Sequence, residues 1–375
     1  MNLKNKNLGF LMTRNMSLSI WDTLGMIDRE LKPYKELAKH FNAIYIFSYG
    51  SHDDIFSSQL PSNVIIISKP KFFNNLFYSF LLLFIHRKIF KKLDIIKTNQ
   101  MDGSWPAIFA KKFFSTKIVI RCGYEWLYSL EKSNKSFFKK IIAKKVENFA
   151  YLNADKIILT SEEIKKFVLR NFNINNSIID VIQNYIDINF FKPINIPKER
   201  NRIIFIGRLE SEKNLINLFN GLVGVNATLV VIGNGSLRCE LEKLSKEKNL
   251  NVIFMGNIPQ SSIPDELNKS QLFILPSLYE GNPKALLEAM SCGLPCIGTN
   301  VDGIRSVIEH GKNGFICNSD PESLRKSINF LLENKGVCDK LGHNARAYVE
   351  ENNSLQGFIN KELKIYKSFF YEKSL

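Results

Sequence analysis

Two glutamates, Glu280 and Glu288, stand on either side of a Gly-Asn-Pro turn in the second half of the chain. The apolar run 271–276 before them is typical of a buried parallel strand, and Pro283 suits the first turn of a helix. Such a helix start offers free backbone N–H groups and a positive dipole end to an anion. At about 100° per residue, we expect the two carboxylates about two helical turns apart on nearly one face. An anion site flanked by groups that accept hydroxyls predicts binding of a phosphorylated sugar.

A pair of cations follows an earlier strand-like run. Residues 203–206 are apolar, Gly207 and Arg208 end the run, and Lys213 stands at the start of the next helical pattern. We expect both cations at the carboxyl end of that strand. Arginine offers a planar fork and lysine a point charge, and together they suit a diphosphate leaving group.

Two further glycine turns end strand-like runs in the same half. Gly233-Asn-Gly235 is a weak dinucleotide-binding match, because Arg238 occupies the place of the third glycine. A tight strand-to-helix turn is therefore the favoured interpretation. The second turn, Gly256-Asn257-Ile258, could wrap a base with its backbone.

These residues need a scaffold that brings strand ends together. Strand-like and helix-like segments alternate along the whole chain, which indicates α/β architecture with parallel sheets. We predict two Rossmann-like domains facing one another across a cleft, with ligand at the carboxyl ends of the strands. The predicted boundaries are 1–190 for the first domain, 191–201 for a linker with two prolines, 202–354 for the second domain and 355–375 for a helix that returns to the first domain. Closure at a hinge would then control access.

Length and composition support this division and exclude some functions. A chain of 375 residues exceeds one ordinary core. The net charge of +15 is compatible with nucleic acid, an anionic membrane or an acidic small substrate. No zinc-finger spacing, recognition-helix pattern or aromatic RNA-binding signature is present, so we predict no nucleic-acid partner. Cys292 and Cys296 have no second pair that would complete a zinc site, so we predict that they are small buried residues. The six scattered cysteines imply no disulfides and fit a reducing cytoplasm.

Two basic stretches in the first half admit two interpretations. The apolar window 76–85 is far shorter than the roughly 20 residues that span a bilayer, and lysines and arginines flank it. The stretch 135–145 alternates cation pairs with apolar pairs at helical spacing. Either stretch could lie on anionic lipid. Alternatively, both are outer helices with an apolar face on the sheet and lysines in solvent. No signal peptide is visible at the start of the chain.

The ordered cations and glutamates together resemble the retaining GT-B glycosyltransferases of family 4, the glycosyltransferase group 1 proteins. The resemblance covers residues 181–318 and is strongest in the second domain. Its opening segment is similar to the family's Ile-Pro-Asn-Gly-Val-Asp crossover. Here Asn184 matches the motif, while Gln183 and Tyr185 replace the usual proline and glycine.

The resemblance implies a role for each matching residue. Arg208 and Lys213 would hold the donor diphosphate, and with Glu280 they form the predicted catalytic set. Glu288 would bind the ribose hydroxyls, and Glu280 would contact the donor sugar near the reaction centre. The remaining donor contacts would come from backbone at Gly207, Gly256, Asn257, Ile258, Gly281, Asn282, Pro283, Lys284 and Ala285.

The expected chemistry follows from charge. Breaking the anomeric bond leaves a nucleoside diphosphate with added negative charge, while the sugar becomes oxocarbenium-like. Because two cations take the place of a metal, we expect neither metal nor cofactor. Retention of configuration is implied by the family, and UDP is favoured because such donors are common.

The first domain should bind the acceptor, and here the resemblance is weaker. Many members carry a histidine after the strand that corresponds to 117–120, but this chain has Arg-Cys-Gly-Tyr-Glu there. The loop after the first strand holds one glycine, Gly25. Gly123 and Glu125 could equally be turn and cap residues. The candidates for acceptor contact are Gly25, Arg121, Cys122, Gly123 and Glu125.

The sequence therefore predicts a cytoplasmic glycosyltransferase that moves a hexose or N-acetylhexosamine from a nucleotide-diphosphate sugar to a saccharide. A further hypothesis makes the acceptor lipid-linked, at the inner membrane face, in bacterial surface polysaccharide assembly (O-antigen, capsule or lipopolysaccharide). One alternative is a nucleotide-sugar epimerase or a phosphorylase on the same fold. Another is a catalytically silent subunit that binds sugar nucleotides.

Overall fold

The computed structural model describes residues 2–123, 125–132 and 137–371. Position 124 of the first-domain motif and positions 135–136 of the second basic stretch lie outside this set. The contacts divide the chain into two compact units. One contains Met1–Gln183 with Phe358–Leu375, and the other contains Asn184–Gly357.

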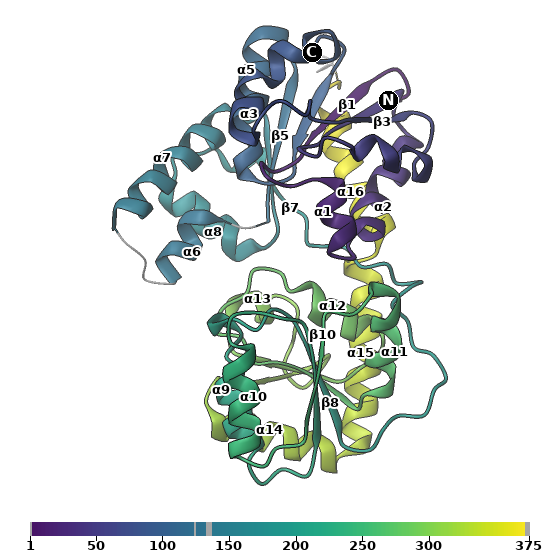
Figure 1. Ribbon diagram of the computed structural model, residues 1–375, viewed down its shortest axis with the longest axis vertical. Coiled ribbons are helices and arrows are strands. Elements are labelled where there is room, and N and C mark those ends of the chain that lie inside the picture. The colour runs from purple at the N-terminus through teal and green to yellow at the C-terminus, as the bar shows by residue number, and fades with distance from the viewer. Residues whose placement is uncertain (1, 124, 133–136, 372–375) are drawn as a thin grey trace. The chain divides into compact units, whose positions relative to one another are not determined.

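The first unit is built on a seven-stranded parallel sheet in the order β3-β2-β1-β4-β5-β6-β7 (Figure 1). Its strands are β1 (Asn7–Leu11), β2 (Ala43–Phe47), β3 (Val64–Ile67), β4 (Ile95–Thr98), β5 (Lys117–Cys122), β6 (Lys156–Leu159) and β7 (Ile179–Val181). Its helices are α1 (Leu18–Thr23), α2 (Ile27–Ala38), α3 (Asn75–Ile85), α4 (Arg87–Phe90), α5 (Ser104–Phe114), α6 (Trp126–Lys132), α7 (Phe137–Asn153), α8 (Glu162–Asn171) and most of α16 (Leu355–Ser368). Right-handed crossovers in the two directions from β1 place α2 and α3 on opposite faces of the sheet.

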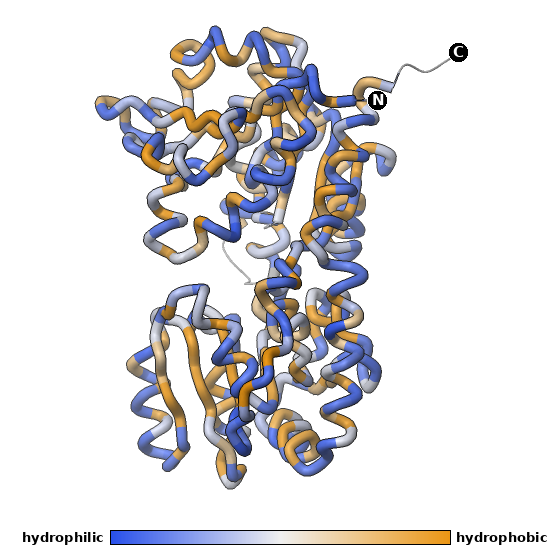
Figure 2. Tube along the Cα trace, turned by 90° about the vertical axis from the view of Figure 1, so that its right-hand side faces the viewer, coloured by the Kyte–Doolittle hydropathy of each residue, from blue (hydrophilic) through white to orange (hydrophobic). Residues whose placement is uncertain are grey.

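The second unit repeats the design with six parallel strands in the order β10-β9-β8-β11-β12-β13. They are β8 (Arg202–Ile206), β9 (Thr228–Ile232), β10 (Val252–Gly256), β11 (Leu272–Leu275), β12 (Cys296–Thr299) and β13 (Phe315–Cys317). The helices are α9 (Leu215–Leu222), α10 (Arg238–Glu247), α11 (Ile263–Lys269), α12 (Lys284–Ser291), α13 (Asp302–Arg305), α14 (Pro321–Glu333) and α15 (Lys335–Asn352). Figure 2 shows the hydropathy behind this layering, with apolar strands between helices that alternate apolar and polar segments. The two predicted Rossmann-like domains are thus confirmed.

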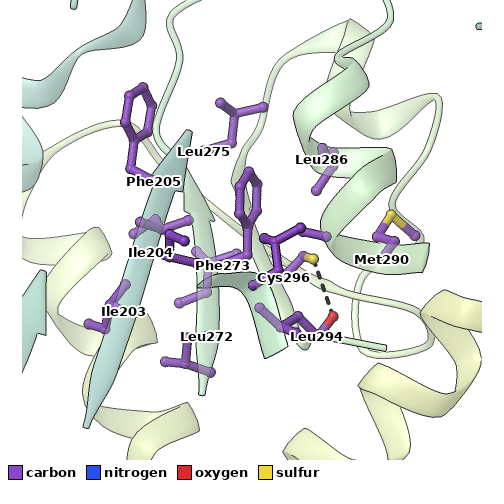
Figure 3. Close-up of a cluster of buried hydrophobic side chains, with 14 of the residues drawn as sticks. Ile203, Ile204, Phe205, Leu272, Phe273, Leu275, Leu286, Met290, Leu294 and Cys296 are labelled. Carbon is purple, nitrogen blue, oxygen red and sulfur yellow. Dashed lines mark hydrogen bonds between the residues drawn. The ribbon is translucent and has the colours of Figure 1, made fainter. Parts of the chain in front are cut away.

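The hydrophobic core of the second unit is formed by its strands and the helices that pack on them. β8 and β11 are continuous apolar runs because helices cover both faces of the sheet. Figure 3 shows Phe205 and Phe273 from these strands in the same buried cluster as Leu286 and Met290, which are one turn apart on α12. This packing fixes the start of α12 relative to the end of β11.

The predicted linker 191–201 is instead part of the second unit. Phe191 is buried, and its carbonyl accepts a 2.8 Å hydrogen bond from Arg346. The backbone N–H of Glu199 donates to the carbonyl of Lys269 over 2.8 Å. The prolines break the periodicity, as expected, but the segment is held by packing and hydrogen bonds. The chain passes between the units at Gln183 and again before Phe358.

Candidate functional site

The candidate site lies at the reversal of strand order in the second sheet. From β8 the chain proceeds to β9 on one side, whereas β11 pairs with β8 on the other. Loops that leave two such strands at their carboxyl ends diverge and leave room for a ligand. Lys213 follows β8 in the short 3₁₀ turn Ser211–Lys213, and Glu280 follows β11.

Lys213 and Glu280 form an ion pair at this point, with Nζ 2.5 Å from Oε1. The hydroxyl of Ser277 donates a second hydrogen bond of 2.7 Å to the same carboxylate oxygen. The two charged side chains are 15% and 11% exposed, so they are accessible yet well ordered by their surroundings. The topology therefore brings together a cation and an acid that lie on different loops. The sequence analysis predicted that Lys213 and Glu280 bind the same ligand, but it did not predict that their side chains contact each other.

The backbone around the pair is held by residues that the sequence analysis did not single out. Asn214, in the left-handed region at φ 55°, is buried and donates 3.1 Å to the carbonyl of Pro276. The N–H of Leu278 donates 2.8 Å to the carbonyl of Glu212. These bonds join the loop after β8 to the loop after β11. An asparagine before an apolar helix is the one local signal that could have found this role.

Gly303 and Thr299 complete the support of Glu280. A Cβ on Gly303 would lie 2.2 Å from the carbonyl oxygen of Glu280, so only glycine allows this approach. The hydroxyl of Thr299 donates to the carbonyl of Ser277. The carboxylate of Glu280 is thus held by a rigid loop as well as by its ion pair.

Arg208 occupies a different environment. Its side chain is 73% exposed and pairs with Glu212 over 2.7 Å. An exposed pair of this kind contributes little to stability and exchanges partners readily. Arg208 thus lies on the same loop as Lys213. There its guanidinium group could leave Glu212 and bind a phosphate instead.

The glycine turns stack the strand ends of β8, β9 and β10 against one another. The N–H of Gly207 donates to Ile232, and that of Gly233 donates to Gly256, over 3.0 and 2.8 Å. Gly233 has φ +127°, and a Cβ there would lie 2.0 Å from the carbonyl oxygen of Gly207. The interpretation of this segment as a tight turn is confirmed. Asn257, after β10, is exposed, while Ile258 packs partly on the core.

The expected helical spacing of the two glutamates is wrong. α12 begins at Lys284, and Pro283 precedes it as the N-cap residue. Glu280 therefore lies in the loop, outside the helix, while Glu288 is the fifth helical residue and is almost fully buried. The Gly281–Asn282 turn delays the helix, so the 100° rule does not relate the two carboxylates. The N-terminus of α12 still presents the positive end of the helix dipole at the end of this loop.

The charge of Glu288 acts on the interior. Burial raises the pKa of the Cys292 thiol to about 12, and the negative charge of Glu288 adds to the rise. A thiol held protonated in this way is structural, in agreement with the prediction that Cys292 and Cys296 are small buried residues. The proposed ribose contact of Glu288 stays a prediction.

Three asparagines tie the Asn282 turn to the crossover segment. The backbone N–H of Asn184 donates to Oδ1 of Asn282 over 2.9 Å, and Nδ2 of Asn184 donates to the Asn282 carbonyl over 2.8 Å. Asn353 in turn donates 2.9 Å to the carbonyl of Asn184. The motif position Asn184 thus positions the donor turn. Nearby, the Lys284 ammonium lies 5.9 Å from the ring centre of Tyr185, the residue that replaces the family glycine.

The first-unit candidates have mostly structural contacts. Gly25 ends α1 at φ +67°, with its N–H donating to Asp22. Gly123 donates 2.9 Å to the side chain of Gln100. Arg121, half-buried on β5, lies 6.0 Å from the ring centre of Phe358 on α16. These residues stay predictions as acceptor contacts.

Cys122 and Glu125 are buried, which speaks against direct contact with an acceptor. The Cys122 thiol and the Tyr151 hydroxyl donate to the Glu125 carboxyl group. The cap of α6 is supplied by Glu147 on α7, which accepts from the N–H of Trp126 over 2.7 Å. The sequence offered Glu125 as the cap, but a residue far along the chain takes that role.

Glu125 and Glu147 hydrogen-bond to each other in this interior. Burial raises the pKa of Glu147 to about 9, and the nearby charge of Glu125 adds to that rise. Burial raises the pKa of Glu125 as well. Two buried carboxyl groups in contact share a proton because both cannot ionise. In place of the family histidine, this region thus has a buried core in which two carboxyl groups are joined by a hydrogen bond.

Two family matches cover most of the chain. Residues 187–348 match glycosyl transferases group 1, and residues 34–190 match glycosyltransferase family 4. The chain therefore belongs to the glycosyltransferases of family 4, the group 1 proteins. It is 26% identical over 300 residues to the UDP-Gal:alpha-D-GlcNAc-diphosphoundecaprenol alpha-1,3-galactosyltransferase of Escherichia coli, covering 74% of this chain and 76% of that protein. It is 29% identical to the N-acetyl-alpha-D-glucosaminyl L-malate synthase of Bacillus anthracis, over 52% of this chain and 54% of that protein.

Solved structures agree on the fold. The sucrose-phosphate synthase of Thermosynechococcus elongatus aligns with a TM-score of 0.78 at 16% identity, over 97% of this chain and 99% of that one. The Anabaena HepE protein in complex with UDP and glucose aligns with a TM-score of 0.75 at 18% identity, over 97% and 100%. The GT-B fold class is therefore confirmed, while the cleft between the units stays a prediction.

Proposed function

We propose that this protein is a retaining glycosyltransferase that moves a hexose or N-acetylhexosamine from a UDP-sugar to a saccharide acceptor. The observation that carries the proposal is the contact of Lys213 with Glu280 at the strand-order reversal of the second sheet. In this proposal Lys213 would neutralise the diphosphate, and Glu280 would accept a sugar hydroxyl. Arg208 stands on the same loop as Lys213, and the N-terminus of α12 follows the Glu280 loop.

The mechanism follows from where charge develops. As the anomeric C–O bond breaks, its electron pair stays on the diphosphate oxygen, and the sugar carbon becomes electron-poor. Lys213 and the N-terminus of α12 stabilise the growing negative charge because they are oriented before the reaction. The exposed Arg208 joins them when it leaves Glu212 for the phosphate. Glu280, held by Ser277, accepts a sugar hydroxyl and orients the ring. The acceptor hydroxyl then attacks the anomeric carbon from the face that the diphosphate leaves and passes its proton to the departing diphosphate oxygen, so the configuration is retained.

The acceptor is proposed to be a lipid-linked saccharide used in bacterial surface polysaccharide assembly, at the cytoplasmic face of the inner membrane. The support is the E. coli relative, whose name specifies a UDP-galactose donor and a diphosphoundecaprenol-linked acceptor. No helix in the described part of the chain is long and apolar enough to cross a bilayer. Access to such an acceptor would therefore require binding at the membrane surface.

Metal independence is proposed because two cations face the diphosphate. The test is thermal unfolding with UDP-, GDP-, ADP- and CMP-linked sugars, each with and without EDTA. A ligand that binds the native state raises the unfolding temperature by mass action. We expect the largest rise with a UDP-sugar, unchanged by EDTA. A rise that EDTA removes would contradict metal independence, and no rise with any donor would contradict the proposed donor site.

A donor-only reaction separates the alternatives. Conversion of the nucleotide sugar into a different one without acceptor would indicate an epimerase. Consumption of inorganic phosphate would indicate a phosphorylase. A transferase releases nucleoside diphosphate in proportion to the acceptor added, whereas a silent subunit would bind donor and release none.

A further inference from the structure

Helix α3 has apolar side chains on its outer face as well as its inner one. Tyr78 and Leu82 are buried against the sheet, as a helix of an α/β unit requires. Phe77, Phe80 and Phe84 recur at helical spacing on the exposed side, and Phe84 is 70% exposed. A helix that is apolar all round normally lies in a core or in lipid. The interpretation of α3 as an outer helix with an apolar face on the sheet is thus correct, and its exposed phenylalanines are an addition that this interpretation did not include.

Helices α5 and α7 extend this surface. The Trp105 ring of α5 lies 4.7 Å from Phe80 of α3 and 6.1 Å from Phe109, so aromatic contacts join the two helices. α5 in turn packs beside α7 (Figure 1). On α7, Phe138 is 76% exposed, and Ile142, one turn on, is exposed as well. The apolar face is here defined by Phe77, Phe80, Phe84, Phe113, Phe138 and Ile142.

The charges around the apolar face are almost all positive. α4, α5 and α7 carry Arg87, Lys88, Lys112, Lys139, Lys140, Lys144 and Lys145. Lys111 of α5 is paired with Asp155 over 3.0 Å. Within α3, α4, α5 and α7, all of them in the described part of the chain, the acidic residue is Glu147, and it is buried. Exposed lysines beside exposed phenylalanines form a surface that can bury rings and still keep ammonium groups at a polar boundary.

We propose that the apolar face of α3, α5 and α7 docks on an anionic lipid bilayer. Phenylalanine rings would enter the boundary between headgroups and acyl chains, and the lysines would contact anionic headgroups. A second copy of the chain fits less well, because a symmetric interface would place lysines against lysines. An uncharged membrane would leave the excess of lysine without counter-charge. The proposal extends the proposed function but needs neither donor nor catalysis.

The test is co-sedimentation of the full chain with vesicles of phosphatidylcholine, alone or mixed with phosphatidylglycerol. The apolar variant combines Phe80→Ser, Phe84→Ser and Phe113→Ser. The charge variant combines Lys139→Gln, Lys140→Gln, Lys144→Gln and Lys145→Gln. Matched controls change exposed residues of the second unit: Val223→Ser, Ile253→Ser and Phe330→Ser in one, and Lys243→Gln, Lys246→Gln, Lys248→Gln and Lys326→Gln in the other.

We expect binding to the anionic vesicles only, and weaker binding at high salt. Because burying a phenylalanine contributes about tenfold or more in affinity, the apolar variant, which lacks three, should bind about a thousandfold more weakly. The charge variant, which lacks four lysines at roughly fivefold each, should bind roughly 600-fold more weakly. Both controls should bind as the parent does. Trp105 fluorescence should shift to the blue when the parent binds, and the Trp105→Phe variant should lose most of that shift.

Two outcomes would overturn the proposal. One is that the parent binds neither vesicle, or that the apolar and charge variants bind as the parent does. The other is a dimer in solution that the apolar variant dissociates, which would make the face an interface between copies. The UDP-dependent rise in unfolding temperature is measured on every variant. Its persistence shows that the fold and donor site are intact, so failure of membrane binding is distinguishable from failure of the proposed function.

Discussion

Each unit contains an ion pair, and the two pairs differ in burial. In the first unit, Lys97 on β4 pairs with Glu362 on α16, and both side chains are essentially inaccessible. In the second unit, Lys213 and Glu280 are joined in similar geometry but remain partly exposed. Burial lowers the pKa of Lys97, while the charge of Glu362 opposes that shift.

The difference teaches which charges can act on a ligand. A buried ion pair cannot exchange partners without leaving an uncompensated charge in the interior, so its role is to hold the fold together. Lys97 and Glu362 thereby hold the C-terminal helix to the first unit. A partly exposed pair can trade one partner for a phosphate or a sugar hydroxyl. The same reasoning separates the buried Glu125–Glu147 pair from the exposed Arg208–Glu212 pair.

The largest expected effect is on stability, from breaking the buried ion pair of Lys97 with Glu362. Lys97→Ala should lower the free energy of unfolding by about 3–5 kcal/mol, because Glu362 is left buried without its cation. Urea unfolding measures this change. The double variant Lys97→Met with Glu362→Leu should recover most of the loss, and Lys312→Ala, at an exposed pair, should change nothing measurable. A small loss in Lys97→Ala would show that the burial contrast is not what separates the two pairs.

Glu280→Gln should affect chemistry more than binding. Turnover should fall by about 10²–10³, the scale seen when one preorganised electrostatic contact is removed. Because Lys213 loses its acidic partner, the affinity for UDP should stay equal or rise. Single-turnover kinetics and calorimetry measure the two quantities. If UDP affinity falls in parallel with turnover, Glu280 serves the fold and not the sugar.

Lys213→Ala tests the other half of the same pair. UDP binding should weaken by about 1.5–3 kcal/mol, the contribution of a hydrogen bond to a charged group. Calorimetry measures this, and Lys243→Ala on the exposed face of α10 is the matched control. Equal affinity in Lys213→Ala and Lys243→Ala would remove Lys213 from the donor site.

The buried carboxyl pair predicts a pH dependence of stability. The pKa of Glu147 is about 9 in the native state, and an unfolded glutamate ionises near pH 4.3. Between these values unfolding releases a proton, so the free energy of unfolding falls as pH rises, by up to about 1.4 kcal/mol per pH unit. This stability is fully present at acidic pH and is lost as pH approaches the native pKa.

Glu147→Gln mimics the protonated form and should flatten that decline. Urea unfolding across neutral and alkaline pH measures the slope for both proteins. Equal slopes would mean that the pair is ionised in the native state, and the contrast with the exposed pairs would fail.

The smallest expected effect concerns the hydrogen bonds that join Asn184 to Asn282 and Asn353. Asn184→Ala removes the side-chain bond to the Asn282 carbonyl and should destabilise by about 0.5–1.5 kcal/mol. It should also raise the KM for donor more than it lowers kcat, because Asn184 positions the donor turn. Asn352→Ala, which loses only an exposed bond to Tyr348, is the control. Unchanged KM would limit Asn184 to a structural role.

Much of the second unit was predictable because its signals are local. The apolar strands, the glycine turns and the cations after β8 are read within short windows, and the observed elements lie within a few residues of those expected. The final helix, expected within 355–375, is Leu355–Ser368 and belongs mostly to the first unit. The register of Glu280 with Glu288 was not predictable, because the turn at Gly281–Asn282 shifts the helix start.

The sequence by itself determined the α/β class, the family and the identity of the charged residues in the donor half, since these depend on periodicity and spacing. Only the tertiary structure decided which of those charges meet, because contact between Lys213 and Glu280 depends on β11 pairing with β8. It also decided which charges are buried: Glu147 reaches α6 from another helix, and Glu362 reaches β4 from the far end of the chain. The low dielectric around a buried charge is created by packing, so it cannot be read from the spacing of residues along the chain. That environment decides whether a charged residue acts on a ligand or on the fold.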